Sequence, residues 1–240
     1  MPLPEIKHPI FKLVVPSTKQ TVSYRPYTVQ EEKLLLVVRM SEDIDEIIST
    51  LKQIIKNCIL DDINVEKLAM FDIEYIFINI RKVSVSNEVE LFYTDEEKNL
   101  KIPMKVNLDD VKVKFNPEHS DKIAINDSLG IKMKYPNLDN MLKIEYSLRA
   151  GEFDKKVVDD SVFSMILNCI EYVFDDDKIY NEFTKEELES FILSLKIEDL
   201  KKIQRFFETL PAVEHTVNVR ISETETREVV LRGLKDFFTF

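Results

Sequence analysis

The sequence contains three glycines in 240 residues, Gly130, Gly151 and Gly233, and no two of them lie within twenty positions. Loops that bind dinucleotides or phosphates need clustered glycines, because their backbone must approach the phosphate and adopt positive φ angles within a few residues. The spacing of these glycines therefore excludes such loops.

Long hydrophobic runs are also missing. The longest apolar run is about five residues, at 34–38, whereas a membrane-spanning helix needs roughly 20. The first twelve residues contain no apolar stretch of the kind found in signal peptides. We therefore expect a soluble, cytosolic chain without a transmembrane segment.

Cysteine and histidine are scarce. Cys58 and Cys169 each fall in a helical apolar pattern, so we expect both to be small buried side chains; a disulfide between them has no support in a cytosolic protein. The sequence has no CxxC, HExxH or Cys/His cluster, and the acidic run 175–183 has a tyrosine where a calcium loop would need its glycine. We expect no metal and no cofactor.

Basic residues are outnumbered by acidic ones, 33 to 44, which gives a formal net charge of −11. Proteins that bind nucleic acids usually have a basic excess or a basic face. The lysines here are interleaved with acids throughout, so nucleic acids and anionic membranes are not expected partners. With so many acids, no catalytic carboxylate pair can be selected from the sequence.

The first third of the chain predicts two short strands followed by helices. Residues 10–15 and 21–27 are extended and interrupted by prolines. Thr28 and Glu31 have the spacing of a capping box, so a helix is predicted to begin at Thr28. A second helix follows Ser41, and a third is predicted to end at about Val83.

The middle of the chain alternates apolar and polar residues, which is typical of half-buried strands. We predict a small antiparallel β unit over 86–136, with Gly130 at a turn or bulge. Helical spacing returns afterwards and predicts helices over 154–174, 184–195 (capped by Thr184 and Glu187) and 197–209. A β-hairpin is predicted over 214–234.

Together these patterns predict an α+β fold that is mostly helical, with an N-terminal strand pair, the inserted β unit and the C-terminal hairpin. The predicted domains are 1–85 (N-terminal strands and helices), 86–136 (β unit) and 137–240 (C-terminal helical region, hairpin and aromatic tail). No internal repeat is present.

Two arginines stand among aromatic and apolar residues, Arg25 in "YRPY" and Arg81 in "INIRKV". Each can form a buried ion pair, with Asp72 or Glu32 as candidates, or contact a partner, since Arg and Tyr are enriched at interfaces. The terminal phenylalanines either pack on the core or form an exposed apolar end that binds another chain. The speculative partner-binding residues are Tyr24, Arg25, Tyr27, Arg81, Phe237, Phe238 and Phe240.

Several stretches in order resemble one family: "VPSTKQTVSYRPYTVQEEKLLL", "FDIEYIFINIR", "DSLGIKMKYP" and "FFETLPAVEHTVNV". They are similar to the baseplate hub subunit and hub assembly proteins of T4-like contractile-tailed phages, over about residues 9–238. The matching positions are Tyr24, Arg25, Pro26, Glu31, Glu32, Phe71, Asp72, Arg81, Tyr135 and Pro136. Residues 216–232 lack the paired cysteines of some relatives, so the resemblance implies no metal site.

The resemblance implies a non-enzymatic protein that helps to assemble the baseplate hub by binding other hub or tail proteins. It implies action in the host cell cytoplasm, or a place in the virion baseplate. One alternative is a permanent homo-oligomeric component of the virion. Another is a hydrolase that uses scattered acids and His215, for which no catalytic motif is present.

Overall fold

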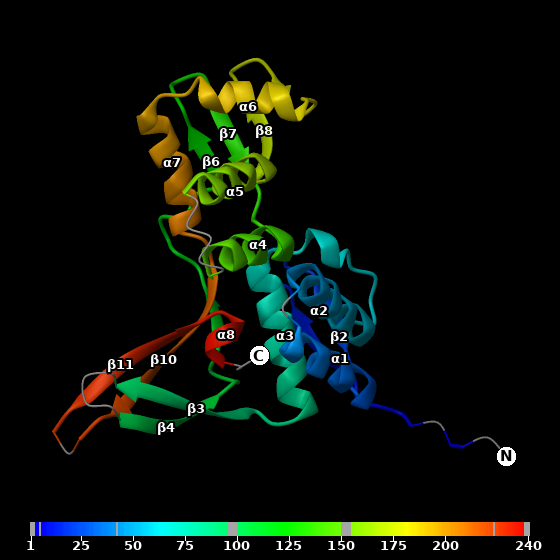
Figure 1. Cartoon of the computed structure of the whole chain (residues 1–240). Coiled ribbons are helices and arrows are strands. Elements are labelled where there is room, and N and C mark those ends of the chain that lie inside the picture. Colours follow the sequence, from blue (N-terminus) through cyan, green and yellow to red (C-terminus); the bar gives the residue numbers. More distant parts are fainter. Residues whose placement is uncertain are drawn as a thin grey trace. The chain divides into compact units, whose positions relative to one another are not determined.

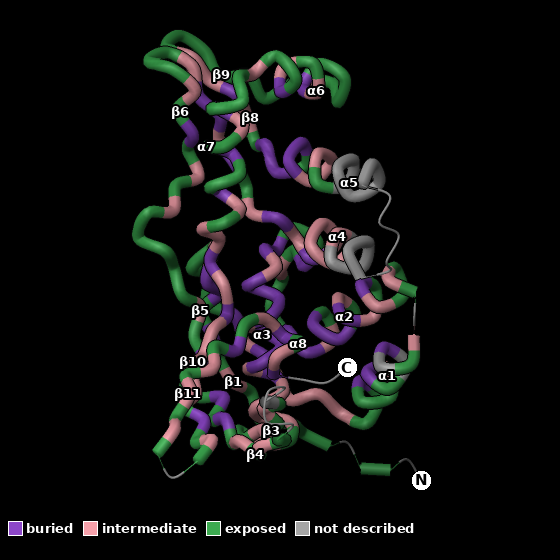
Figure 2. Tube along the Cα trace, turned by 60° about the vertical axis from the view of Figure 1, so that its left-hand side comes forward, coloured by how far each residue is buried: buried purple, intermediate pink, exposed green. Residues whose placement is uncertain are grey.

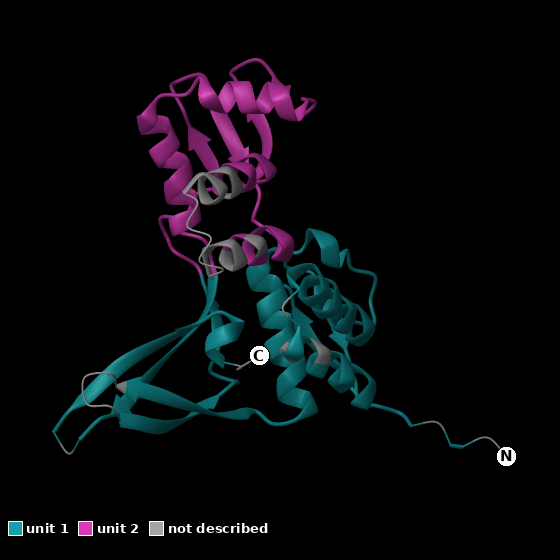
Figure 3. Ribbon diagram, viewed as in Figure 1, with its two compact units in different colours: residues 1–114, 212–240 teal, residues 115–211 magenta. Residues whose placement is uncertain are grey.

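The computed structural model describes residues 3–4, 6–41, 43–95, 100–149, 155–222 and 224–237. The chain forms two compact units (Figure 3): unit 1 comprises 1–114 and 212–240, and unit 2 comprises 115–211. The β unit predicted over 86–136 contributes strands to both. None of the helices in the described ranges is long and apolar enough to cross a membrane.

The fold is α+β, but the prediction that it is mostly helical is wrong. Helices hold 39% of the residues, and the described residues also form eleven strands in four sheets of two to four strands. The prediction underestimated strands because short apolar segments with β-branched residues fit either period.

Unit 1 contains helices and strands from both ends of the chain (Figure 1). Its elements in chain order are β1 (Phe11–Val14), β2 (Thr21–Tyr24), α1 (Val29–Met40), α2 (Ile44–Cys58), η1 (Val65–Lys67), α3 (Met70–Ser84), β3 (Glu88–Asp95), β4 (Leu100–Asn107), β5 (Lys112–Lys114), β10 (Ala212–Arg220), β11 (Thr226–Arg232) and α8 (Leu234–Phe237).

Helix α3 is the central helix of unit 1. It contacts α2 as well as strands β5 and β10, and Figure 2 shows it buried along most of its length. Ile73, Ile76 and Ile80 are each no more than 1% exposed. Helix α2 is amphipathic: Asp43 caps its N-terminus by accepting the Asp45 N–H, and its aliphatic stripe is buried.

Two β-hairpins lie side by side in unit 1 (Figures 1 and 2). In β3–β4, Leu91 is opposite Met104 and Tyr93 is opposite Ile102, so alternate residues share the half-buried face. In β10–β11, Val217 is opposite Val229. Nη1 of Arg227 donates to the Tyr93 hydroxyl at 3.3 Å, and this hydrogen bond links the two hairpins.

The C-terminal segment of unit 1 is fastened to α3 at one sharp turn. Gly233 follows β11 with φ of 71°, and its N–H donates to the Val213 carbonyl at 3.0 Å. The next N–H, of Leu234, donates to Glu74 Oε1 at 3.2 Å. A Cβ at Gly233 would stand 2.8 Å from that carboxylate oxygen, so both the backbone angle and the space favour glycine.

Unit 2 combines an antiparallel sheet of order β6-β7-β8-β9 with helices (Figure 1). Its buried core draws on the sheet and on α5, α6 and α7, with Ile131, Ile166 and Ile203 among its members. The elements are β6 (Lys122–Ala124), β7 (Gly130–Met133), α4 (Leu138–Arg149), α5 (Lys155–Asn168), β8 (Ile170–Phe174), β9 (Ile179–Tyr180), α6 (Lys185–Leu193) and α7 (Ile197–Glu208).

One helix in unit 2 was predicted too long. The helix expected over 154–174 ends at Asn168, and 170–174 form β8, in which Val173 pairs with Ile131 of β7. The isoleucine and valine of this segment fit a strand as well as a helix. Gly130 begins β7, where a Cβ would stand 2.3 Å from the Phe174 ring. Thr184 and Glu187 form the predicted capping box.

An aromatic cluster in unit 2 surrounds His119. The imidazole lies 5.6 Å from the Tyr135 ring and 5.0 Å from the Phe206 ring, measured between centroids. The Thr209 hydroxyl donates to the Arg205 carbonyl, so it accepts from Nδ1–H of His119 at 2.9 Å. Burial lowers the pKa of His119 and outweighs the opposing charge of Asp121.

We predict that replacing Gly233 with alanine lowers the free energy of unfolding by about 1 to 3 kcal/mol, the usual strain of a non-glycine residue in the left-handed region. Gly233→Asn should lose less, because asparagine tolerates positive φ. Urea denaturation followed by circular dichroism measures both. An alanine variant as stable as the wild type would contradict this account.

We also predict that unit 2 becomes less stable as the pH falls below about 6.5, the ordinary histidine pKa. The folded state holds His119 with a lowered pKa, so the unfolded chain binds the proton first and stability declines with acidification. Urea titrations between pH 7 and pH 5 should show a smaller decline for His119→Phe than for the control His8→Phe. Equal declines would refute the assignment.

Candidate functional site

The "YRPY" stretch lies in the loop between β2 and α1, where Arg25 forms an ion pair with Glu31. Nη2 of Arg25 donates to Glu31 Oε1 at 3.0 Å, and Nη1 donates to Oε2 at 3.4 Å. The Glu31 side chain is only 1% exposed. The sequence predicted Asp72 or Glu32 as the partner of Arg25. That prediction is incorrect, because Glu31 forms the ion pair.

Glu31 also caps helix α1, as the spacing predicted. Its Oε2 accepts the Thr28 N–H at 2.8 Å and the Thr28 hydroxyl at 2.7 Å. Burial alone would raise the pKa of Glu31, but the hydrogen bonds from Arg25 and Thr28 outweigh it and lower the pKa to about 2. The carboxylate is therefore ionised at neutral pH and fixes the loop to the helix.

Asp72 is a second buried acid that links separate segments by hydrogen bonds. It accepts the Ser17 N–H at 2.9 Å and the Ser17 hydroxyl at 2.5 Å, and it accepts the Ala69 N–H at the start of α3 at 3.2 Å. Its side chain is fully buried, and burial raises its pKa despite these bonds. Asp72 thus ties the β1–β2 turn to α3.

Two of the predicted partner-binding residues lie inside unit 1. Tyr24 is 3% exposed and its ring lies 5.7 Å from the ring of Phe11. Phe237, in α8, is fully buried. Phe238 and Phe240 lie outside the described residues. For the aromatic tail, the structure therefore places its first phenylalanine in the core.

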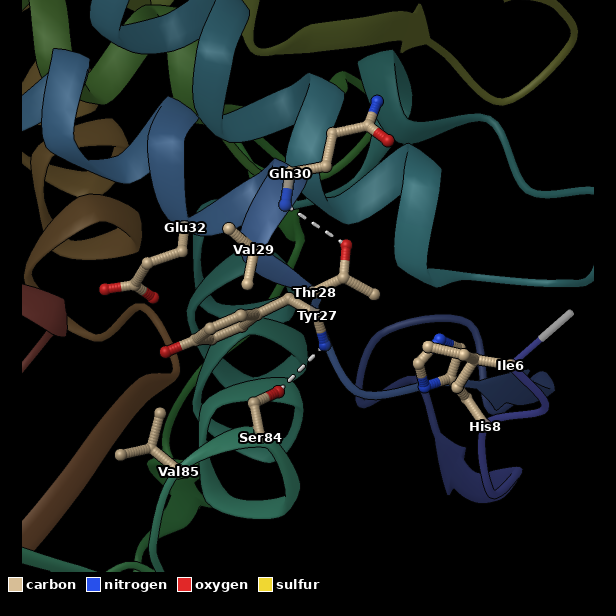
Figure 4. A pocket seen from close by; sticks show the side chains of 9 residues that line it. All are labelled: Ile6, His8, Tyr27, Thr28, Val29, Gln30, Glu32, Ser84 and Val85. Atoms are coloured by element: carbon tan, nitrogen blue, oxygen red, sulfur yellow. Dashed lines mark hydrogen bonds between the residues drawn. The ribbon is translucent and has the colours of Figure 1, made fainter. Parts of the chain in front are cut away.

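Tyr27 lines a surface hollow of about 580 Å³ (Figure 4). Its N–H donates to the Ser84 hydroxyl at 2.9 Å, which joins the start of α1 to the end of α3. Burial, partly opposed by the charge of Arg81 and supported by Glu32, raises the pKa of Tyr27 to about 12. The structure thus brings Tyr27 and Arg81 into one neighbourhood, with the phenol neutral at physiological pH.

The hollow is open and its aliphatic lining is exposed. Ile6, from the N-terminal segment, is 77% exposed; Val29 is 73% and Val85 58% exposed. Figure 4 shows Ile6 and His8 on one side and Tyr27, Val29 and Val85 on the other. An open apolar hollow of this kind suits contact with side chains of another protein.

Sequence reasoning selected Tyr27 but missed the aliphatic lining of this hollow. Ile6, Val29 and Val85 come from three separate segments, and no local pattern brings them together. The sequence therefore offers no signal that would have found these residues. Within the described residues, no group of three or more His, Cys, Asp or Glu could hold a metal ion.

We predict that Glu31→Gln lowers the free energy of unfolding at pH 7 by about 2 kcal/mol, since it removes a charged acceptor of several hydrogen bonds. The folded-state pKa lies below the ordinary 4.5, so the contribution is present above pH 4.5 and is lost as the pH falls toward about 2. Urea denaturation should show the variant losing less stability over that interval. The exposed neighbour variant Glu32→Gln is the control; equal stability of both variants at pH 7 would contradict the role of Glu31.

Comparison with family models assigns the chain to a known family. The family model described as T4 bacteriophage base plate protein matches residues 8–239. No curated protein matches, and no solved structure matches either. The family match includes both units and every lining residue of the hollow except Ile6. Because it spans nearly the whole sequence, the chain belongs to the family of T4 bacteriophage base plate proteins.

Proposed function

We propose that this protein helps to build the baseplate hub of a contractile-tailed phage by binding other baseplate proteins. The observation that carries the proposal is the family match over residues 8–239, which makes the chain a baseplate-related structural or assembly protein. Beyond the family match, we propose that the protein acts at the baseplate hub and that it does so during assembly in the host cytoplasm. It includes no catalytic step.

The hollow around Tyr27 supports binding to another protein. Ile6, Val29 and Val85 present aliphatic groups to solvent at one place, and removing such groups from water is the main driving force of association. Two lining residues, Tyr27 and Ser84, are joined by a hydrogen bond, and the Arg25–Glu31 pair fixes the loop that leads to Tyr27. A surface held in this way loses little conformational entropy when a partner binds.

Arg81 is half-buried on α3, about one turn before the lining residue Ser84. We assign partner contact to Tyr27 and Arg81 among the residues predicted from the sequence. Arg25 supports the surface through its pair with Glu31. The contacts of Tyr24 and Phe237 lie within unit 1, so they are not part of the proposed surface.

We predict that the tagged chain, co-expressed with each baseplate protein of the same phage, co-purifies with at least one of them. Val85→Asp should weaken that capture about tenfold or more, since it places a charge where an apolar contact forms. The measurement is affinity purification followed by size-exclusion chromatography, with the bound protein identified by its mass.

Leu193→Asp is the matched control, because Leu193 is an aliphatic residue of unit 2 that is at least as exposed as Val85, at 69% against 58%. Wild-type chain that captures no baseplate protein would refute the proposed function. Mass spectrometry of purified virions distinguishes two modes of action: presence at a fixed copy number indicates a permanent component, and absence indicates an assembly protein that departs.

A further inference from the structure

Strand β1 is an open edge of the sheet that it forms with β2. The far side of β2 is covered, because Leu60 N–H donates to the Ser23 carbonyl at 2.9 Å and Arg25 N–H donates to the Cys58 carbonyl at 2.9 Å. Over the part of the chain that the structure describes, β1 pairs with β2 alone. One side of β1 therefore has no neighbouring strand.

The register of the hairpin shows which main-chain groups face that side. Val15 N–H donates to the Gln20 carbonyl at 2.8 Å, and pairing continues with Leu13 opposite Val22. Because hydrogen-bonded pairs alternate in antiparallel strands, the N–H and C=O groups of Lys12 and Val14 point away from β2. These groups are the donors and acceptors that an added strand uses.

The side chains of the same strand divide between two faces. Leu13 and Val15 are buried, at 6% and 0% exposure, whereas Ile10 and Val14 are exposed at 64% and 48%. Lys12 lies between them and is exposed too. Figure 2 shows the chain before β1 exposed as well. An added strand would thus find aliphatic contacts at Ile10 and Val14 on the outer face.

The charges on this segment identify the partner's chemistry. The chain as a whole has a net charge of −11, yet between residues 6 and 14 every charged side chain is a lysine, Lys7 and Lys12. Two copies of β1 paired edge to edge would bring their lysines together, and like charges across strands are destabilising. The complement of this edge is an apolar strand that carries an acidic residue.

We infer that the open edge of β1 accepts a strand from another baseplate protein, with apolar side chains on Ile10 and Val14 and a carboxylate near Lys12. This inference rests on the proposed function, because it names a further surface, beside the hollow, that a captured partner contacts. Main-chain hydrogen bonds to Lys12 and Val14 supply affinity, and alternate side chains supply specificity.

The test uses the partner captured by co-expression. Lys12→Pro removes an outward N–H, and proline at such a position of an edge strand leaves the hairpin intact. Lys12→Glu keeps the N–H and reverses the charge. Each variant should bind the partner at least tenfold more weakly, while Lys122→Glu, on edge strand β6 of unit 2, should bind as the wild type does. Circular dichroism verifies that all variants are folded.

Hydrogen exchange on the complex supplies an independent readout, with slower exchange expected for the amides of Lys12 and Val14 when the partner is bound. Capture that persists in both Lys12 variants without protection of these amides would overturn the inference and leave the proposed function standing. Failure of the wild type to capture any baseplate protein overturns both. Light scattering that shows a dimer lost in Lys12→Pro would identify a second copy as the occupant and overturn the assigned partner.

Discussion

The N-terminal half of unit 1 depends on the hydrogen bonds and the ion pair that the buried carboxylate of Glu31 accepts. It receives the guanidinium of Arg25 and the N–H and hydroxyl of Thr28, while Asn57 at the end of α2 donates to it at 3.4 Å. A carboxylate buried without such donors would be neutral and costly. Because the donors are present, one anion joins the loop after β2, the start of α1 and the end of α2.

Two buried acidic side chains of α3 also accept hydrogen bonds from other segments of the chain. Asp72 receives main-chain and hydroxyl donors from Ser17 and Ala69, and Glu74 receives the N–H of Leu234. Both are on the central helix, so the N-terminal hairpin and the C-terminal turn are each attached to it through a buried acid. The outward-facing side chains of Ile10 and Val14, and those of Ile6, Val29 and Val85 at the hollow, stay exposed to solvent.

Local spacing predicted much of the fold and little of the candidate site. The Thr28–Glu31 cap, the end of α3 and the C-terminal hairpin follow from neighbours in sequence. The ion partner of Arg25 did not, because several acids lie within reach of a long side chain and sequence cannot rank them. The strand at 170–174 was mistaken for helix because its pairing with β7 is non-local, and the hollow depends on three separate segments meeting.

The chain leaves unit 1 after Lys114 and returns at Ala212, and these two residues pair with each other across β5 and β10. During synthesis on the ribosome, unit 2 is therefore complete before the strand that closes unit 1 has emerged. Until then the side of α3 that later packs on β10 stays uncovered. Unit 1 therefore stays incompletely folded while unit 2 is synthesised. During that time its exposed apolar surface can aggregate or bind another chain.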